Sequence, residues 1–254
     1  MGAVRFFRAA ALKATVARIG VAAASLLLLS SNIIHAQQGA SVSQLLRQFE
    51  GERVFWRQFE VARAIVAAND KGVLPQLEPW LSHPDRHVRG NAAFIFGGLG
   101  DSRGFDVIVA MLDDHSGNRA VEQISSVGLP WVQGQIREDR YYAAHLLGDL
   151  KDARAIPILV GLLTDPDVKD IAPWSLAQIG NRSAIAPLIG SLSDPDPNMR
   201  VLAMHALVEL RATEALPRVR LLLDDRTRSN FGKLESVAEA AQAAIARLQS
   251  ESAR

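Results

Sequence analysis

A repeat of thirty residues is the feature that most constrains this fold. Three stretches of eleven residues align without gaps at that offset: "YYAAHLLGDLK" from residue 141, "IAPWSLAQIGN" from 171 and "VLAMHALVELR" from 201. Pro157, Pro187 and Pro217 keep the same spacing. Self-similarity at such a period indicates stacked supersecondary units. The chain is therefore predicted to consist of repeated units that bury their apolar faces against their neighbours.

Each unit has the pattern of two helices. Apolar residues recur at helical spacing in a shorter stretch such as "ARAIPILVGLL" and again in the aligned stretch that follows it. Between them, "TDPD" and "SDPD" stop the first helix at proline, and the aspartate can cap the second. Arg200 follows Asp196 by four residues, which predicts a local charge contact. We expect antiparallel helical hairpins.

Two stretches interrupt the period. About 21 extra residues lie within residues 113–139, between the two helices of one unit, and a smaller insertion surrounds "DDRTRSNFGK". Long insertions in compact repeats are uncommon and often functional. The predicted organisation is an N-terminal segment and cap at 37–54, then a repeat domain at 55–250 with its insertion at 113–139.

The first 36 residues have the layout of a secretory signal peptide. Four basic residues precede the apolar run "IGVAAASLLLLS", and "IIHA" ends in a small residue. A membrane anchor is the alternative, but the apolar run is short and "SSN" interrupts it, whereas a span needs about 20 apolar residues. We expect cleavage after Ala36, a periplasmic or secreted protein, and no stable membrane span after cleavage.

Charge and cysteine content exclude several classes of function. Without residues 1–36 the chain has 24 basic and 27 acidic groups, so nucleic acid is a poor candidate partner. Cysteine is absent, which excludes disulfides, cysteine nucleophiles and thiolate metal sites. No phosphate-binding loop, nucleophile elbow or dinucleotide fingerprint is present.

The stretch "DPDPNMRVLAMHALVEL", together with "NRSAIAPLIGSLSD", resembles the short HEAT-like repeats named after phycobilisome lyases. The resemblance covers about residues 55–250. It implies an all-α fold, an α-solenoid of about five to six helical hairpins whose second helices line a concave face. The motif residues serve packing and capping, so the resemblance does not transfer an active site. Some HEAT-like proteins are di-iron hydroxylases with His-Glu ligand pairs, and no His-Glu dipeptide occurs here.

No metal, cofactor or catalytic residue is predicted. His83 and His87 are four residues apart, a spacing that suits metal ligands on one helix, but Pro84 and Asp85 separate them. We interpret both histidines as exposed turn residues. Paired acids such as "DD" at 113 also fall at turns between helices, where capping is their expected role.

The candidate partner-binding residues lie on a stripe of the second helices and in the insertion. His145 and His205 share the fifth place of their aligned helices, and Trp174 replaces small residues found in other units. Such a stripe suits a recognition surface and an unconstrained solvent face equally well, and Trp174 and Trp131 suit either core filling or an aromatic anchor. The candidates are Phe94, Trp131, Tyr142, His145, Asp149, Trp174, Ser175, His205 and Glu209.

Two function hypotheses follow. The favoured one is an exported non-enzymatic scaffold that holds a partner protein or peptide against its concave face and the insertion; an assembly scaffold without a discrete ligand cannot be distinguished from it. The alternative is a lyase-like or cofactor-handling HEAT-repeat enzyme. That alternative needs a deep pocket lined by Trp131, Trp174 and histidines, whereas the favoured hypothesis expects no enzymatic activity.

Overall fold

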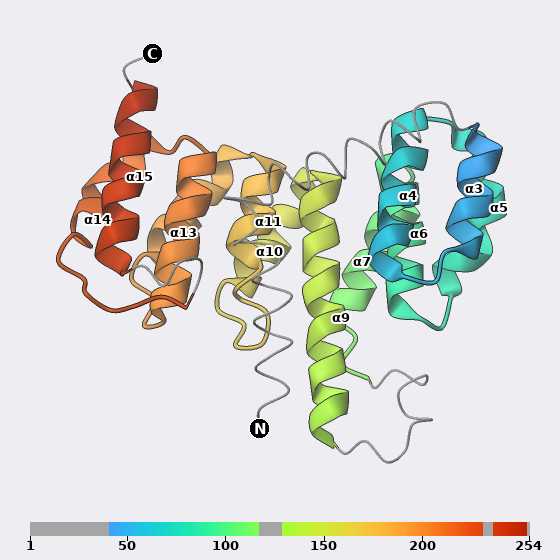
Figure 1. Ribbon diagram of the computed structural model, residues 1–254, viewed down its shortest axis with the longest axis horizontal. Coiled ribbons are helices and arrows are strands. Elements are labelled where there is room, and N and C mark those ends of the chain that lie inside the picture. The colour runs from blue at the N-terminus through green and yellow to red at the C-terminus, as the bar shows by residue number, and fades with distance from the viewer. Residues whose placement is uncertain (1–40, 117–128, 231–235, 253–254) are drawn as a thin grey trace. The chain divides into compact units, whose positions relative to one another are not determined.

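The computed structural model describes residues 41–116, 129–230 and 236–252. Twelve α-helices occupy these ranges, joined by short 3-10 turns and packed in sequential pairs (Figure 1). The predicted all-α fold of HEAT-like hairpins is confirmed. The predicted signal peptide at 1–36 lies outside the described residues, as do residues 117–128 of the insertion.

Residues 40–184 form one compact unit. The cap hairpin pairs the first two helices, and each later hairpin pairs a first helix with a second helix that carries the aligned stretch. Its helices are α3 (Val42–Gly51), α4 (Phe55–Ala68), α5 (Leu74–Leu77), α6 (Arg86–Gly98), α7 (Ser102–Leu112), α9 (Leu129–Leu150), α10 (Ile156–Leu162) and α11 (Ala172–Ile179). Its 3-10 turns are η1 (Lys71–Val73), η2 (Glu78–Ser82), η3 (Ala153–Ala155) and η4 (Arg182–Ala184).

The second compact unit includes the described residues 185–230 and 236–252. It contains two hairpins, in which α12 packs on α13 and α14 packs on α15. The elements are α12 (Ile185–Ser191), α13 (Pro197–Glu209), η5 (Thr213–Ala215), α14 (Leu216–Arg220) and α15 (Val237–Ser252).

Asp85 and Asp196 cap α6 and α13 as predicted, whereas the aspartates of "TDPD" do not cap α11, whose N-cap is Ile171. Arg200 does not pair with Asp196. The Asp196 carboxylate accepts a hydrogen bond from the backbone N–H of Asn198 at 2.9 Å, which occupies it as an N-cap. Arg200 instead reaches the next turn, where its Nη2 lies 2.9 Å from Asp225 Oδ2. Arg140 makes the same step to Asp165, at 2.6 Å. These arginines therefore tie successive hairpins together.

Close approach of helices depends on glycine at two contacts. A Cβ placed on Gly104 of α7 would lie 2.2 Å from the carbonyl oxygen of Ala93 in α6. A Cβ on Gly148 of α9 would lie 2.7 Å from Cα of Ser175 in α11. No side chain fits in either gap, so these glycines set how tightly neighbouring helices of the first unit pack.

The insertion lengthens a helix. Helix α9 begins at Leu129, so residues 129–139 add turns to the N-terminal end of a second helix. Helix α11 is shorter, and Pro173 lies in its first turn, where proline is tolerated. Across the described ranges, no helix combines the length and the apolar character that a membrane span requires.

Candidate functional site

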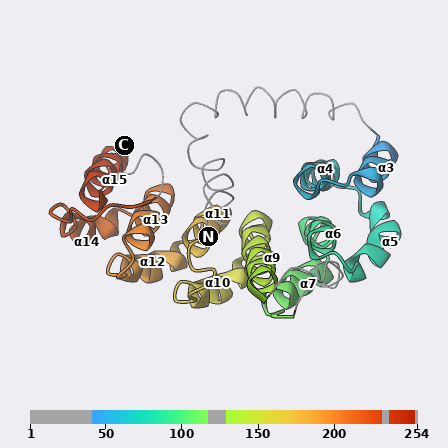
Figure 2. The ribbon, with the colours of Figure 1, turned by 60° about the horizontal axis from the view of Figure 1, so that its bottom comes forward.

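Five partly exposed rings form a continuous row across four helices of the first unit. We call this row, Phe55 (α4), His87 (α6), Tyr142 and His145 (α9) and Trp174 (α11), the ring face. Successive ring centroids are 4.4, 5.2, 6.5 and 4.3 Å apart. Figure 2 views these helices nearly end-on: α4, α6, α9 and α11 form an inner arc, with α3, α5, α7 and α10 outside it. The hairpin repeat therefore brings rings from four units onto one side.

Two buried phenylalanines back the row. Phe59 of α4 and Phe94 of α6 meet edge to face with centroids 4.9 Å apart, and both are nearly inaccessible to solvent. Phe59 also lies 6.3 Å from the rings of Tyr142 and His145. Aromatic pairs at such distances add stabilisation beyond the area they bury. The exposed rings thus rest on a packed aromatic layer.

A buried polar network fixes Tyr142 and the start of α4. The Tyr142 hydroxyl donates to Asn91 Oδ1. Asn91 Nδ2 donates to the carbonyl of Phe55 at 3.0 Å and to Gln58 Oε1 at 2.9 Å. Gln58 Nε2 in turn donates to the carbonyl of Phe49 at 3.0 Å. Because each buried amide finds partners, the network rigidifies this part of the ring face.

His145 of the ring face forms a polar pair with the adjacent Asp149. His145 stacks on Trp174 at an interplanar angle of 23°, and its Nδ1 lies 3.3 Å from Asp149 Oδ2, one helical turn away. The contact is not aligned as a hydrogen bond, and among the described residues buried Nδ1 has no hydrogen-bond partner. Burial lowers the pKa of His145, and the charge of Asp149 offsets this only in part. Burial likewise raises the pKa of Asp149, and the charges of His145 and Arg63 offset this rise only in part.

A second polar cluster anchors the extended start of α9 to α6. The nearly buried Arg86 guanidinium donates to Asp139 Oδ2 at 2.8 Å and to Asp114 Oδ2 at 2.6 Å. Gln135 Nε2 donates to the other oxygen of Asp139 at 2.8 Å. Burial alone would raise the pKa of Asp114, but hydrogen bonds from Ser116 and Arg86 outweigh it and lower the pKa to about 2. The bonds of Arg86 are all to protein groups, so this cluster is structural.

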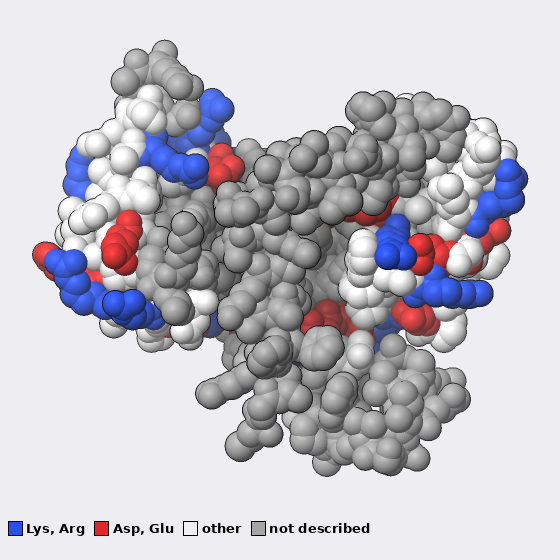
Figure 3. Space-filling view, in the orientation of Figure 1, with Lys and Arg blue, Asp and Glu red and all other residues white. Residues whose placement is uncertain are grey.

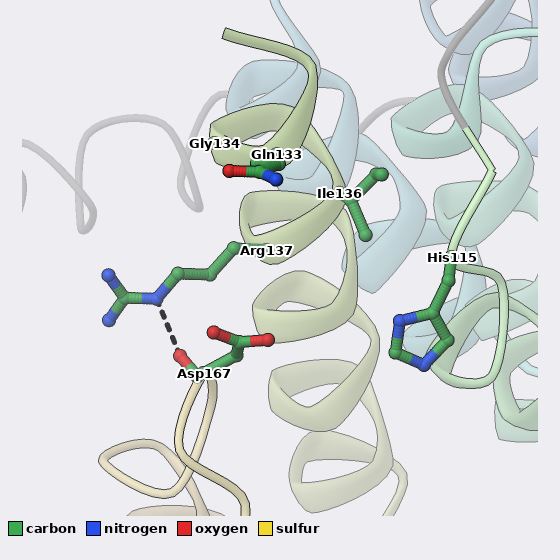
Figure 4. A pocket seen from close by; sticks show the side chains of 6 residues that line it. All are labelled: His115, Gln133, Gly134, Ile136, Arg137 and Asp167. Carbon is green, nitrogen blue, oxygen red and sulfur yellow. Dashed lines mark hydrogen bonds between the residues drawn. The ribbon is translucent and has the colours of Figure 1, made fainter. Parts of the chain in front are cut away.

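An open hollow of about 450 Å³ lies beside the extended part of α9 (Figure 4). Arg137 crosses it and donates through Nε to the carbonyl oxygen of Asp167 at 2.5 Å, while His115 lies on the other side of the helix. The polar groups do not converge there. Within the described residues, no group of three metal-ligating side chains gathers. In the view of Figure 3, acidic and basic side chains lie interspersed over the coloured parts of the surface.

The structure brings four predicted residues together: Tyr142, His145, Asp149 and Trp174. Trp174 is half-buried, so it acts neither as pure core filling nor as a freely projecting anchor. His205 and Glu209 are exposed on α13 of the second unit. Trp131 belongs to α9, but its side chain lies outside the described residues.

Two predicted surface residues are in the interior. Phe94 lies behind Phe59, and Ser175 is fully buried with its hydroxyl donating to the carbonyl of Ala144 at 2.9 Å. Ser175 is buried because it packs against Gly148 of α9. Neither side chain is placed to meet a partner, and this part of the predicted stripe needs correction.

Sequence reasoning missed two members of the ring face. His83 lies outside α6 as expected, but His87 is inside its first turn and packs on Phe55. Phe55 opens α4 and is 42% exposed. The available signal was helical spacing: His87 precedes Asn91 by four residues, so both lie on one side of α6.

The fold and these residues define a HEAT-repeat protein. Residues 164–231 match HEAT repeats, and residues 88–114 and 139–165 match the PBS lyase HEAT-like repeat. The chain therefore contains HEAT repeats and HEAT-like repeats of the phycobilisome lyase type. The stretch at 139–165 includes Tyr142, His145 and Asp149. HEAT repeats bind proteins in general.

Individual proteins similar to this chain have more specific names than the repeat families. The chain is 38% identical over 97 residues to "Phycocyanobilin lyase subunit alpha" of Synechococcus elongatus, covering 34% of this chain and 36% of that protein. It is 29% identical over 147 residues to "Bilin biosynthesis protein PecE" of Nostoc sp., covering 56% and 53%. The chain thus spans about a third to a half of the length of these relatives. A solved engineered protein is 20% identical at a TM-score of 0.44, covering 82% of this chain and 96% of its own.

These relatives overturn the favoured function hypothesis. They are named for bilin lyases and bilin biosynthesis, so the interpretation as a non-enzymatic protein-binding scaffold was wrong. The expectation of no enzymatic activity was wrong as well, because the similarity points to lyase-related activity. The error has a physical origin: repeat motifs record packing and capping, and ligand-facing residues lie between those positions.

Proposed function

We propose that this protein handles a bilin and has a lyase-related activity centred on the ring face. One observation carries the proposal: the stretch of phycobilisome lyase type at 139–165 supplies Tyr142 and His145 of the ring face and the adjacent Asp149. Curated relatives named for phycocyanobilin lyase and bilin biosynthesis support the same substrate class.

The chemistry of the ring face suits such a ligand. A bilin is an open-chain tetrapyrrole with flat conjugated rings, N–H donors and carboxylate side chains. Ligand sites combine apolar and aromatic walls with few polar groups that fix orientation. Phe55, Tyr142 and Trp174 supply aromatic surface, and His145 with Asp149 supplies the polar groups.

The direct test is a titration of the purified chain with phycocyanobilin, followed by visible absorption and tryptophan fluorescence. We expect a changed pigment band and saturable quenching. Trp174→Leu should weaken binding by at least about tenfold, since an aromatic anchor contributes more than about 1.4 kcal/mol. Trp56→Leu is the matched control, because Trp56 is 52% exposed and makes its ring contact with Arg57. An unchanged pigment spectrum at saturating protein would contradict the proposal.

A companion protein is part of the proposal. Relatives carry the name "subunit alpha", and HEAT repeats bind proteins in general. We expect the chain, purified from its native cells, to carry a second protein in stoichiometric amount. A chain of the same native mass before and after removal of other proteins would argue against a companion.

Export remains a separate proposal, supported by the basic-then-apolar layout of residues 1–36. N-terminal sequencing of the protein from native cells should begin at Gln37. A mature protein that retains residues 1–36 would contradict cleavage after Ala36.

A further inference from the structure

We infer that Asp149 is the acceptor that orients a bilin on the ring face, taking the N–H groups of a tetrapyrrole that lies along Tyr142, His145 and Trp174. This inference rests on the proposed function and deepens it, since it assigns the group that recognises the ligand. Asp149 is proposed as a positioning residue for ligand binding, and no bond to it forms or breaks.

The first argument is an unsatisfied carboxylate. Only about a fifth of the Asp149 side chain is exposed, at 21%, and within the described residues no hydrogen bond reaches its oxygens. Neither oxygen belongs to the buried unpaired atoms of the described residues, so a donor from water or a ligand can reach the carboxylate. Asp139 differs, because Arg86 and Gln135 donate to both of its oxygens. Asp149 therefore has capacity left for donors that come from outside the chain.

The second argument is that His145 does not supply the missing donor. Its Nδ1 lies 3.3 Å from Asp149 Oδ2 without hydrogen-bond geometry, and Trp174 stacks on the ring and restricts its rotation. Because burial lowers the pKa of His145, the imidazole is neutral at neutral pH and does not cancel the carboxylate charge. The pair thus keeps a negative charge beside aromatic surface.

The surrounding charges leave this arrangement in place. On α4, Arg63 acts on both residues through space, but its side chain is 61% exposed and lies 3.8 Å from Glu60. Just past the end of α9, Lys151 acts on Asp149 only through space. Helix α11 has no titratable side chain.

The third argument is alignment along α9. Tyr142, His145 and Asp149 are spaced by three and four residues, so they lie on one side of the helix. A flat tetrapyrrole that contacts the Tyr142 and Trp174 rings would place the N–H groups of its pyrrole rings near Asp149, one helical turn after His145. N–H donors and a carboxylate form charge-assisted hydrogen bonds, which are stronger than neutral ones.

The test compares Asp149→Asn with Glu209→Gln in phycocyanobilin titrations of the full chain. Glu209 is the aligned acid of α13, exposed in the second unit, so its variant controls for loss of one charge at the same repeat place. Loss of a charged hydrogen bond predicts a ten- to hundredfold weaker affinity for Asp149→Asn, at roughly 1.5–3 kcal/mol. Glu209→Gln should bind as the unchanged protein does.

A pH series separates orientation from structure. Burial raises the pKa of Asp149, so binding by the unchanged protein should weaken as pH falls, at a higher pH than for an ordinary aspartate. Asp149→Asn should lose this dependence, and Asp149→Glu should restore it. A purely structural role predicts equal loss in both variants with an unchanged pH profile, which would overturn the inference even if Asp149→Asn alone folded poorly.

The outcomes distinguish the two proposals. If the unchanged protein binds phycocyanobilin and Asp149→Asn matches Glu209→Gln, whether both are unaffected or both are weakened, the inference fails while the proposed function stands. If the unchanged protein does not bind the pigment, the proposed function fails and the inference fails with it. Selective weakening in Asp149→Asn, with pH dependence regained in Asp149→Glu, supports the inference.

Discussion

Helices α9 and α13 carry the same pair of residue types at the same repeat places, in different surroundings. "HLLGD" from His145 and "HALVE" from His205 are sixty residues apart. His145 is stacked on Trp174 beside Asp149, whereas His205 and Glu209 are exposed. The repeat therefore fixes the position of a residue on its helix, and packing of the neighbouring helix determines whether its side chain is exposed or part of a site.

The helix that makes the difference is α11. Its fourth place is Trp174, where the other aligned helices have a buried residue: Ala93, Ala144 and Met204. Its fifth place, Ser175, is buried like Phe94 of α6, whereas α9 and α13 have histidines at least partly exposed there. The fourth place of α11 thus departs from all three other helices. This departure brings a tryptophan onto the ring face.

The largest expected effect concerns the start of α9, where buried Asp139 takes the place that Met199 holds in α13. Arg86→Met leaves Asp139 with the Gln135 amide as its hydrogen-bond donor and His87 Nε2 at 3.9 Å, and breaking a buried ion pair costs about 3–5 kcal/mol. Chemical denaturation measures this loss. The double variant Arg86→Met/Asp139→Met should recover most of it, since no buried carboxylate remains.

The control for that cycle is Arg103→Met, because the exposed Arg103 pairs with Asp101 and Glu78 at the surface. Its effect should stay within about 1 kcal/mol. A loss from Arg86→Met no larger than this control would show that the buried cluster does not stabilise the extension of α9.

The next effect tests the contact of α9 with α11. Gly148 aligns with Val208 of α13, so Gly148→Val makes the two helices alike at this place. The new side chain would meet the backbone of Ser175, and overpacking costs about 1–3 kcal/mol. Thermal unfolding followed by circular dichroism measures it. Unaltered stability, with the His145–Trp174 stack retained in a solved variant structure, would show that glycine is not required there.

How far sequence predicts this molecule follows from these same residues. The period, the Asp-Pro turns and the alternating apolar stretches repeat, so the hairpins and their order were predictable. The ring face depends on departures from the repeat, namely Trp174, Pro173 and the distant Phe55. Single departures carry no periodic signal, and Ser175 was misplaced because the regular register was assumed. Burial of His145 depends on packing between helices, which residue spacing alone does not reveal.

A smaller effect concerns the loss of folding stability at low pH. Asp114 has a folded pKa of about 2, below its ordinary value of 3.8, so the stability it contributes is present above about pH 4 and is lost as pH falls toward 2. Because the side chain is partly exposed, solvent screening limits this to about 1 kcal/mol. Denaturation at pH 5 and pH 2.5 should show a smaller acid-induced loss in Asp114→Asn than in the unchanged protein. Equal losses would mean that other carboxylates account for the acid sensitivity.

The smallest expected effect isolates the contribution of α11 to the ring face. Trp174→Leu removes the stack and opens His145 to water, so the pKa of His145 should rise toward the ordinary value, because burial is what lowers it. Titration of the histidine ring signals by NMR measures the shift. Trp80→Leu is the control, since Trp80 stacks on His83 and meets Phe49 edge to face, away from His145 in the sequence repeat. A His145 pKa that stays low in Trp174→Leu would assign the burial to α4 and α9, and the difference between α9 and α13 would then not depend on α11.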